Sequence, residues 1–156
     1  MSALPMSEGL DLIRARAAGD HWLAVLITTG GKPDPQVSVV NATVSDHPLT
    51  GQPTVALVAR GATAKLANLR RHPRATLVFR EGWQWVAVSG PVELAGPDDA
   101  MPGLDGEALR LLLRRIYLDA GGHHPDLAEY DRAMVADRRC AVLVAPERIW
   151  TNPPGS

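Results

Sequence analysis

Short apolar segments alternate along this chain with polar turns that are rich in glycine and proline. Six of these segments are dominated by β-branched and aliphatic residues, which predicts β-strands. They are residues 21–29, 36–45, 54–59, 75–79, 83–95 and 139–151. Most are joined by short turns, so they indicate an antiparallel arrangement rather than parallel strands with helical crossovers.

Four further segments have the spacing of helices, at residues 7–19, 62–71, 107–120 and 124–138. Ser7 is the expected N-cap of the first helix. The second helix places Leu66 and Leu69 inward and ends before Pro73, because proline cannot continue a helix. One side of the third helix carries Leu109, Leu112, Leu113 and Ile116. Helices around six strands predict a mainly β fold, either a small barrel or a sandwich.

The length of 156 residues fits one domain, which we expect to span residues 1–156. A net charge of −1 argues against attraction of the whole molecule to nucleic acid or an anionic membrane. The charged first residues predict neither a signal peptide nor a membrane span. The single cysteine, Cys140, excludes an internal disulfide and a multi-thiolate metal site. These features predict a cytoplasmic protein that binds neither nucleic acid nor membrane.

Familiar catalytic motifs are missing from the chain. The "TTGGK" stretch lacks the first glycine and the hydroxyl residue of a phosphate loop, so we interpret it as a hairpin turn. His123 and His124 are adjacent and have no third ligand nearby, which predicts a surface loop and no metal site. His21 is expected at the wet edge of a strand. No catalytic side chain can be named, which favours a bound cofactor that supplies the reactivity.

Cations concentrate between two apolar segments, although the chain has no net positive charge. The cluster contains Lys65, Arg70, Arg71, His72 and Arg74. It is either a solvated helix face or a site for something anionic. Cations near a helix C-terminus complement its dipole, so most of the cluster is interpreted as capping.

Four segments together resemble the pyridoxamine 5′-phosphate oxidase-like split β-barrel family. In order along the chain they are "PQVSVV", "TAKLANLRRHPRATLVF", "GWQWVAVSGPVEL" and "YDRAMVADRRCAVLVAPERIW". The resemblance covers about residues 7–150 and is greatest to the flavin/deazaflavin oxidoreductases, many of which use coenzyme F420. It implies a six-stranded antiparallel split β-barrel of the FMN-binding type, with flanking helices. It also implies a homodimer with two cofactors at the subunit interface.

The resemblance assigns a phosphate site to the start of the helix at 62–71. There, Thr63 and Lys65 match the hydroxyl residue and the lysine that hold the cofactor phosphate in the family. Ser38 matches a position near the phosphate or the ribityl chain. FMN-binding members usually have arginine between the hydroxyl residue and the lysine, where this chain has Ala64. Arg71 and Arg74 are alternative contacts for a polyglutamate cofactor tail.

Further cofactor contacts are implied on two strands. Val58 and Ala59 match positions whose backbone lies along the isoalloxazine ring. Trp83, Gln84 and Trp85 match a segment that reaches the cofactor, often from the neighbouring subunit. On a strand, Trp83 and Trp85 would share one face.

The activity implied by the resemblance is that of an F420-dependent oxidoreductase. Such an enzyme transfers hydride between F420 and a small unsaturated or quinone-like organic substrate. Two alternatives remain open at this point: an FMN-dependent reductase or oxidase of the same fold, and a dimer that binds a flavin or deazaflavin without turnover. The substrate itself is not predicted, because its pocket would be built from strands and loops that vary among such proteins.

Overall fold

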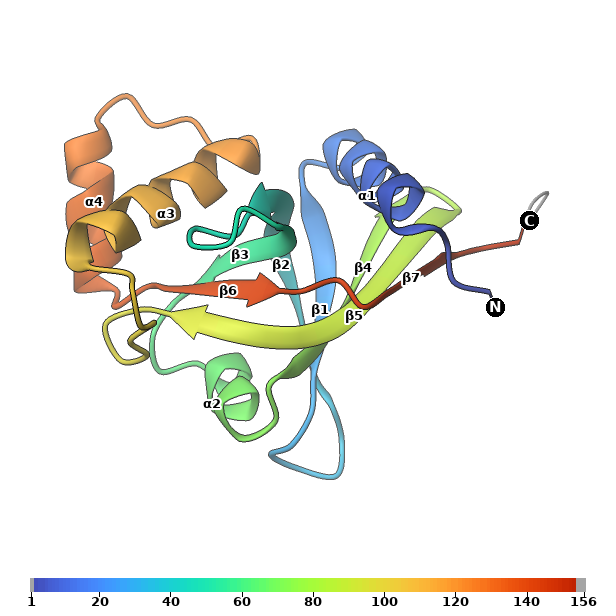
Figure 1. Ribbon diagram of the computed structural model, residues 1–156, viewed down its shortest axis with the longest axis horizontal. Coiled ribbons are helices and arrows are strands. Elements are labelled where there is room, and N and C mark those ends of the chain that lie inside the picture. The colour runs from blue at the N-terminus through green and yellow to red at the C-terminus, as the bar shows by residue number, and fades with distance from the viewer. Residues whose placement is uncertain (1, 154–156) are drawn as a thin grey trace.

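Six antiparallel strands close into a barrel in the computed structural model, which describes residues 2–153. Their order around the barrel is β4–β1–β2–β3–β6–β5, and β5 pairs back with β4 to close it (Figure 1). The strands are β1 (Leu23–Thr28), β2 (Gln36–Asp46), β3 (Pro53–Ala59), β4 (Arg74–Glu81), β5 (Gln84–Ala95) and β6 (Cys140–Val144). The predicted class, a mainly β six-stranded antiparallel split barrel with flanking helices, is therefore confirmed.

A seventh strand, β7 (Arg148–Thr151), pairs with β5 outside the ring of six. The prediction of one continuous strand over residues 139–151 was therefore wrong. After Val144 the chain leaves β3 and continues along β5. There the Ala145 and Glu147 amides donate to the carbonyl oxygens of Pro91 and Ser89. Pro146 interrupts the strand between them, since it has no backbone N–H to donate.

The long strand β5 divides its pairing between two parts of the sheet. Residues 84–91 pair with β4, and residues 92–95 pair with β6. Gly90 lies at this division, and a Cβ there would be 1.8 Å from the Ala145 carbonyl oxygen. Glycine is required at this position because the returning backbone passes too close for any side chain.

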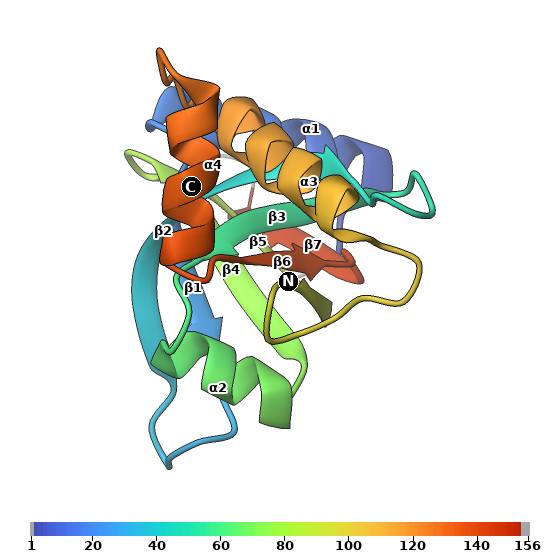
Figure 2. The same cartoon turned by 90° about the vertical axis from the view of Figure 1, so that its left-hand side faces the viewer.

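Helices close the ends of the barrel and cover one side of it (Figures 1 and 2). They are α1 (Met6–Gly19), α2 (Ala64–Arg71), α3 (Gly106–Asp119) and α4 (Leu127–Ala136). The predicted N-cap Ser7 was wrong: α1 begins earlier, and Pro5 occupies the capping position without a side-chain hydrogen bond. The Pro5 backbone is extended, with φ of −53° and ψ of 143°, which is the usual conformation of an N-cap residue. The inward placement of Leu66 and Leu69 on α2 is confirmed.

Two apolar clusters organise the interior. The larger one fills the barrel with side chains such as Leu26, Leu77 and Phe79 and includes the buried face of α1. The second lies outside the barrel wall, where Ala56 of β3 and Leu143 of β6 pack against α3. Strands β3 and β6 are thus buried on both faces, which explains their continuous apolar sequences. Within residues 2–153, no helix is both long and apolar enough to cross a membrane.

Candidate functional site

A cavity of about 820 Å³ lies beside the barrel, between α2 on one side and α3 and α4 on the other. Figure 2 shows α2 below strands β2 and β3, and α3 and α4 above them. The walls come from β2, β3, the turn before α2, the turn before β1, α3 and α4. A volume of this size is in the upper range for small-molecule and cofactor sites.

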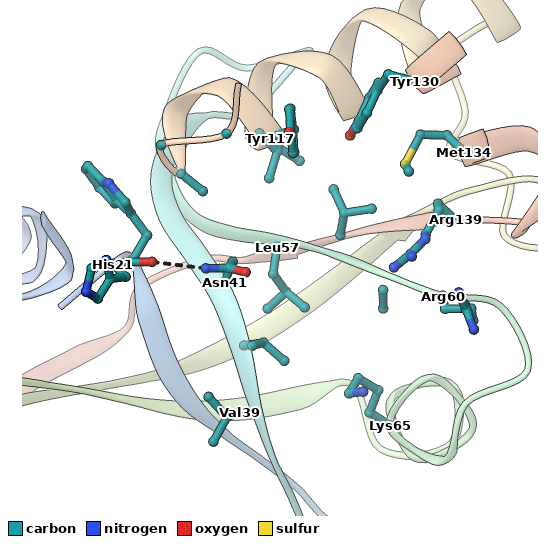
Figure 3. A pocket seen from close by; sticks show the side chains of 18 of the residues that line it. His21, Val39, Asn41, Leu57, Arg60, Lys65, Tyr117, Tyr130, Met134 and Arg139 are labelled. Carbon is teal, nitrogen blue, oxygen red and sulfur yellow. Dashed lines mark hydrogen bonds between the residues drawn. The ribbon is translucent and has the colours of Figure 1, made fainter. Parts of the chain in front are cut away.

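One end of the cavity is cationic. Arg60, Lys65 and Arg139 all line it, and Figure 3 shows them on the same side of the cavity. Asp137 binds both arginines, with its Oδ2 at 3.5 Å from Arg60 Nη2 and 3.2 Å from Arg139 Nη2. Within residues 2–153, the side-chain ammonium of Lys65 makes no hydrogen bond or ion pair. The cavity therefore holds an ammonium group that no protein carboxylate neutralises.

The start of α2 adds free amide groups at this end. Thr63 is the N-cap, but its hydroxyl donates to the Arg60 carbonyl (3.1 Å) and makes no capping bond to the helix. Ala62 precedes it with φ of +59°, a left-handed conformation that aims the chain into the helix. The first N–H groups of a helix have no partner within it, so this end suits an anion.

The opposite wall is aromatic. Tyr117 of α3 and Tyr130 of α4 pack with ring centroids 4.5 Å apart and extend toward the cavity (Figure 3). Their hydroxyls donate to the backbone carbonyls of His123 (3.0 Å) and Leu113 (3.2 Å). Burial raises the pKa of Tyr130 to about 12, so this side chain stays neutral near pH 7. The wall therefore offers apolar ring surface rather than charge.

The turn before β1 forms a third side of the cavity. His21 and Trp22 both line it, and both have left-handed backbones, with φ of +56° and +59°. The Asn41 amide donates to the His21 carbonyl at 3.0 Å and holds this turn against β2. Two consecutive non-glycine residues in this conformation store strain of about 1–3 kcal/mol each. His21 is exposed to solvent as predicted, but it lies in this turn, two residues before β1 begins at Leu23, and not in the strand itself.

Half of the site residues expected from the sequence lie in this cavity. Val58, Ala59, Thr63 and Lys65 are part of its lining. Ser38, on β2, is outside the lining, although its hydroxyl oxygen is buried and has no hydrogen-bond partner in the described part of the chain.

The other expected contacts are on the β4–β5 hairpin, away from the cavity of the same chain. Gln84 and Trp85 begin β5, and Trp83 lies in the turn with Gly82, where 91% of Trp83 is exposed. The expectation that Trp83 and Trp85 share one strand face was wrong, because the hairpin turn contains Trp83. Gly82 has φ of +61°, the positive value that a tight two-residue turn requires.

Two other cations of the basic cluster, Arg70 and Arg74, have carboxylate partners. Arg70 forms a two-bond pair with Asp99, at 2.9 and 2.7 Å. Arg74 pairs with Glu147 at 2.9 Å. These two are structural ion pairs, so Lys65 is distinguished from them by its place in the cavity and by its free ammonium group.

The described residues were also compared with what a metal site or a reactive thiol requires. No cluster of three or more metal-ligating side chains occurs among residues 2–153. Burial raises the pKa of the Cys140 thiol to about 12, which keeps it protonated and weakly nucleophilic at neutral pH.

The sequence interpretation missed several residues of this site. Arg60, Arg139, Asn41, Tyr117 and Tyr130 all line the cavity. Arg60 directly follows the third predicted strand, which was the one local indication available. The others come from β2, from the helices and from the connection before β6, and no spacing along the chain relates them.

Several solved structures have the same fold as this chain. No protein-family model matches the chain. A conserved hypothetical protein from Mycobacterium tuberculosis has a TM-score of 0.64 at 19% identity, over 95% of this chain and 84% of that one. A pyridoxamine 5′-phosphate oxidase-related, FMN-binding protein from Nostoc punctiforme has a TM-score of 0.60 at 15% identity, over 97% and 86%. An F420 reductase has a TM-score of 0.57 at 12% identity, over 83% and 89%.

These likenesses define the fold. The chain has the split β-barrel of the pyridoxamine 5′-phosphate oxidase-like proteins, as its closed ring of six strands also shows. The family resemblance drawn from the sequence is confirmed at the level of fold.

Proposed function

We propose that the chain is an oxidoreductase that holds a flavin-type cofactor in the cavity beside α2. The observation that carries this proposal is the unneutralised Lys65 ammonium next to the uncapped start of α2. Together they form a phosphate site, because free helix amides and a lysine both donate to phosphate oxygens. An FMN-binding protein and an F420 reductase of the same fold support the choice of cofactor class.

The residues of the cavity fit such a group. Thr63 and Lys65 would hold its phosphate, and the strand backbone at Val58 and Ala59 would lie along its ring system. Ser38 lies on β2 outside this lining, so its orphaned hydroxyl is not assigned to the cofactor. When bound, a flavin or deazaflavin supplies a ring atom that accepts or donates hydride.

We further propose that the cofactor is F420 and that the substrate is a small unsaturated or quinone-like molecule. The aromatic wall formed by Tyr117 and Tyr130 supports an uncharged planar substrate, since it presents ring surface without free charge. The protein would position this molecule against the cofactor and exclude water from the site. Correct orientation of the two reactants is the main contribution of the protein to hydride transfer.

We propose a homodimer in which the outer sheet face of one chain meets the other. Val39, Val25 and Val78 are directly opposite one another across β2, β1 and β4, so they share this outer face. Val37 and Val39 are 55% and 67% exposed. Because Val39 also lines the cavity, a second chain on this face would border the cofactor site and could bring its own Trp83–Trp85 hairpin to it.

Equilibrium titration of the purified protein with F420 and FMN, followed by fluorescence, tests the proposal. We expect F420 to bind more tightly than FMN. Tight FMN binding without F420 binding would favour the FMN-dependent reductase or oxidase, which the FMN-binding protein of the same fold also supports. Binding without any turnover of quinone-like acceptors would indicate a cofactor-binding dimer. Failure of both cofactors to bind at micromolar concentration would exclude the oxidoreductase.

A further inference from the structure

Arg139 lies in the connection between α4 and β6, next to another arginine with different surroundings. Arg138 has a left-handed backbone, with φ of +50°, and its guanidinium pairs with Asp98. Arg139 instead lines the large cavity (Figure 3). The backbone changes direction at Arg138, so the two neighbouring side chains diverge. Arg138 reaches the surface carboxylate of Asp98, and Arg139 reaches the cavity.

The guanidinium of Arg139 is only partly satisfied by the protein. Its Nη2 donates to Asp137 at 3.2 Å. Its Nε is buried and has no hydrogen-bond partner in the described part of the chain. A buried donor without an acceptor costs free energy, more so on a charged group, so this atom indicates an acceptor that the chain itself does not provide.

The charge balance of the cavity points the same way. Its lining contains Arg60, Lys65 and Arg139 and no aspartate or glutamate. Asp137, just behind the lining, is shared between the two arginines. Three cations against one carboxylate leave the cavity net positive by about two charges at neutral pH, and an anion entering it would offset this excess of charge.

We propose that Arg139 is a second anion-binding residue of this site, acting with Lys65 on one phosphate group. The two cations come from different elements, Lys65 from α2 and Arg139 from the connection before β6, and both line the cavity. The residue between Thr63 and Lys65 is Ala64, which adds no donor, so Arg139 supplies the guanidinium that this helix start lacks. This proposal rests on the proposed function where the phosphate belongs to the cofactor. The same chemistry would also fit a phosphorylated second ligand.

Paired ligands that differ in the phosphate test this role. The dissociation constants of FMN and riboflavin, and of F420 and its chromophore without the phosphate, are measured for the wild type and for Arg139→Ala. We expect Arg139→Ala to weaken FMN and F420 by tenfold or more, the scale of about one charged hydrogen bond. The phosphate-free partners should change by less than about twofold. Arg139→Lys should recover part of the affinity, because it restores the charge.

Arg138→Ala is the matched control, since it removes a neighbouring arginine that pairs with Asp98. It should leave all four constants unchanged. A loss of equal size for phosphorylated and phosphate-free ligands would mean that Arg139 only anchors Asp137, and it would overturn the proposal. The thermal unfolding midpoint of each variant shows whether a loss of affinity arises because the variant is not folded.

Inorganic phosphate separates this inference from the proposed function. If neither flavin nor deazaflavin binds, the proposed function fails, and a phosphate-induced rise in Tm that Arg139→Ala abolishes would still support the anion site. If phosphate raises the Tm of FMN-saturated wild type but not of the FMN-saturated variant, the anion belongs to a second ligand. The proposal is wrong when neither the phosphorylated ligands nor inorganic phosphate distinguishes Arg139→Ala from the wild type.

Discussion

Lys65 and Arg70 belong to the same short helix, but their surroundings differ, so we infer that one binds a ligand and the other stabilises the fold. Lys65 lines the cavity without an ion pair in the described chain, whereas Arg70 is bound through two hydrogen bonds to Asp99. A cation without a protein partner is available to a ligand. A paired one contributes to the fold, by about 0.2–1 kcal/mol for a partly exposed pair.

Lys65→Ala should therefore weaken binding of the cofactor by about 1.5–3 kcal/mol, the scale of a hydrogen bond to a charged group. Its free energy of unfolding should change little, since the side chain makes no hydrogen bond or ion pair in the described chain. Arg70→Ala is the control and should leave binding nearly unchanged. Titration of both variants measures the difference, and equal losses would show that the two cations had been assigned incorrectly.

At the scale of the elements, the path from β6 to β7 depends on one glycine in β5. A Cβ at Gly90 would be 1.8 Å from the Ala145 carbonyl oxygen, and backbone at that distance must move. Gly90→Ala should lower the free energy of unfolding by about 1–3 kcal/mol or more, as overpacking does. Urea unfolding measures this loss.

Gly106→Ala is the matched control, because a Cβ at this exposed start of α3 meets nothing within 4 Å in the described chain. It should be neutral or slightly stabilising, since alanine favours helix over glycine. If Gly90→Ala lowered the free energy of unfolding no more than Gly106→Ala does, the close approach between Gly90 and the β6–β7 connection would be contradicted.

The two helices over the cavity are joined by a carboxylate. Hydrogen bonds from Arg114, at 2.8 Å, and from Arg110, at 3.0 Å, hold the pKa of Asp131 below its ordinary value. A lowered folded-state pKa stabilises the fold at pH values above the unfolded pKa of about 3.9. This stabilisation is lost as the pH falls through the lower folded value.

Asp131→Asn should accordingly destabilise the protein at pH 7 and flatten the acid limb of its stability curve. Between about pH 4 and 2, the free energy of unfolding should fall more steeply for the wild type than for the variant. Urea unfolding across this range provides the measurement, and parallel curves would contradict the role given to this ion pair.

At the scale of the whole molecule, the outer face of β2, β1 and β4 has the properties of a subunit interface. It presents valines from neighbouring strands, and Val39 connects it with the cavity. Permanent dimers of this kind bury above about 2,000 Å² and are more apolar than the remaining surface.

The wild type should sediment as a dimer at micromolar concentration, and Val39→Glu should shift it toward monomer because a carboxylate would be buried there. Val135→Glu is the control, since Val135 is 77% exposed on α4 and lies on a different element. A stable wild-type monomer would contradict the proposed interface.

The sequence by itself determined most of the elements and the buried face of α2. Strand β1 buries Ala24, Leu26 and Thr28 in strict alternation, and α2 buries Leu66 and Leu69 at helical spacing. These patterns are local: a two-residue or 3.6-residue period states directly which side chains face the interior. Thr63 and Lys65 were named from the family resemblance of this stretch, which could be recognised without a structure because the two residues are neighbours in the sequence.

The tertiary structure alone decided which distant residues share the cavity. Arg139 meets Arg60 through Asp137 because the connection after α4 lies beside the end of β3, where Ala59 pairs with Cys140, and no period along the chain encodes that pairing. Trp83 was misplaced for a related reason. Apolar composition suits both a strand and an exposed turn, and only the pairing of Glu81 with Gln84 places Trp83 in the turn. Local periodicity therefore determines elements, whereas long-range packing determines sites.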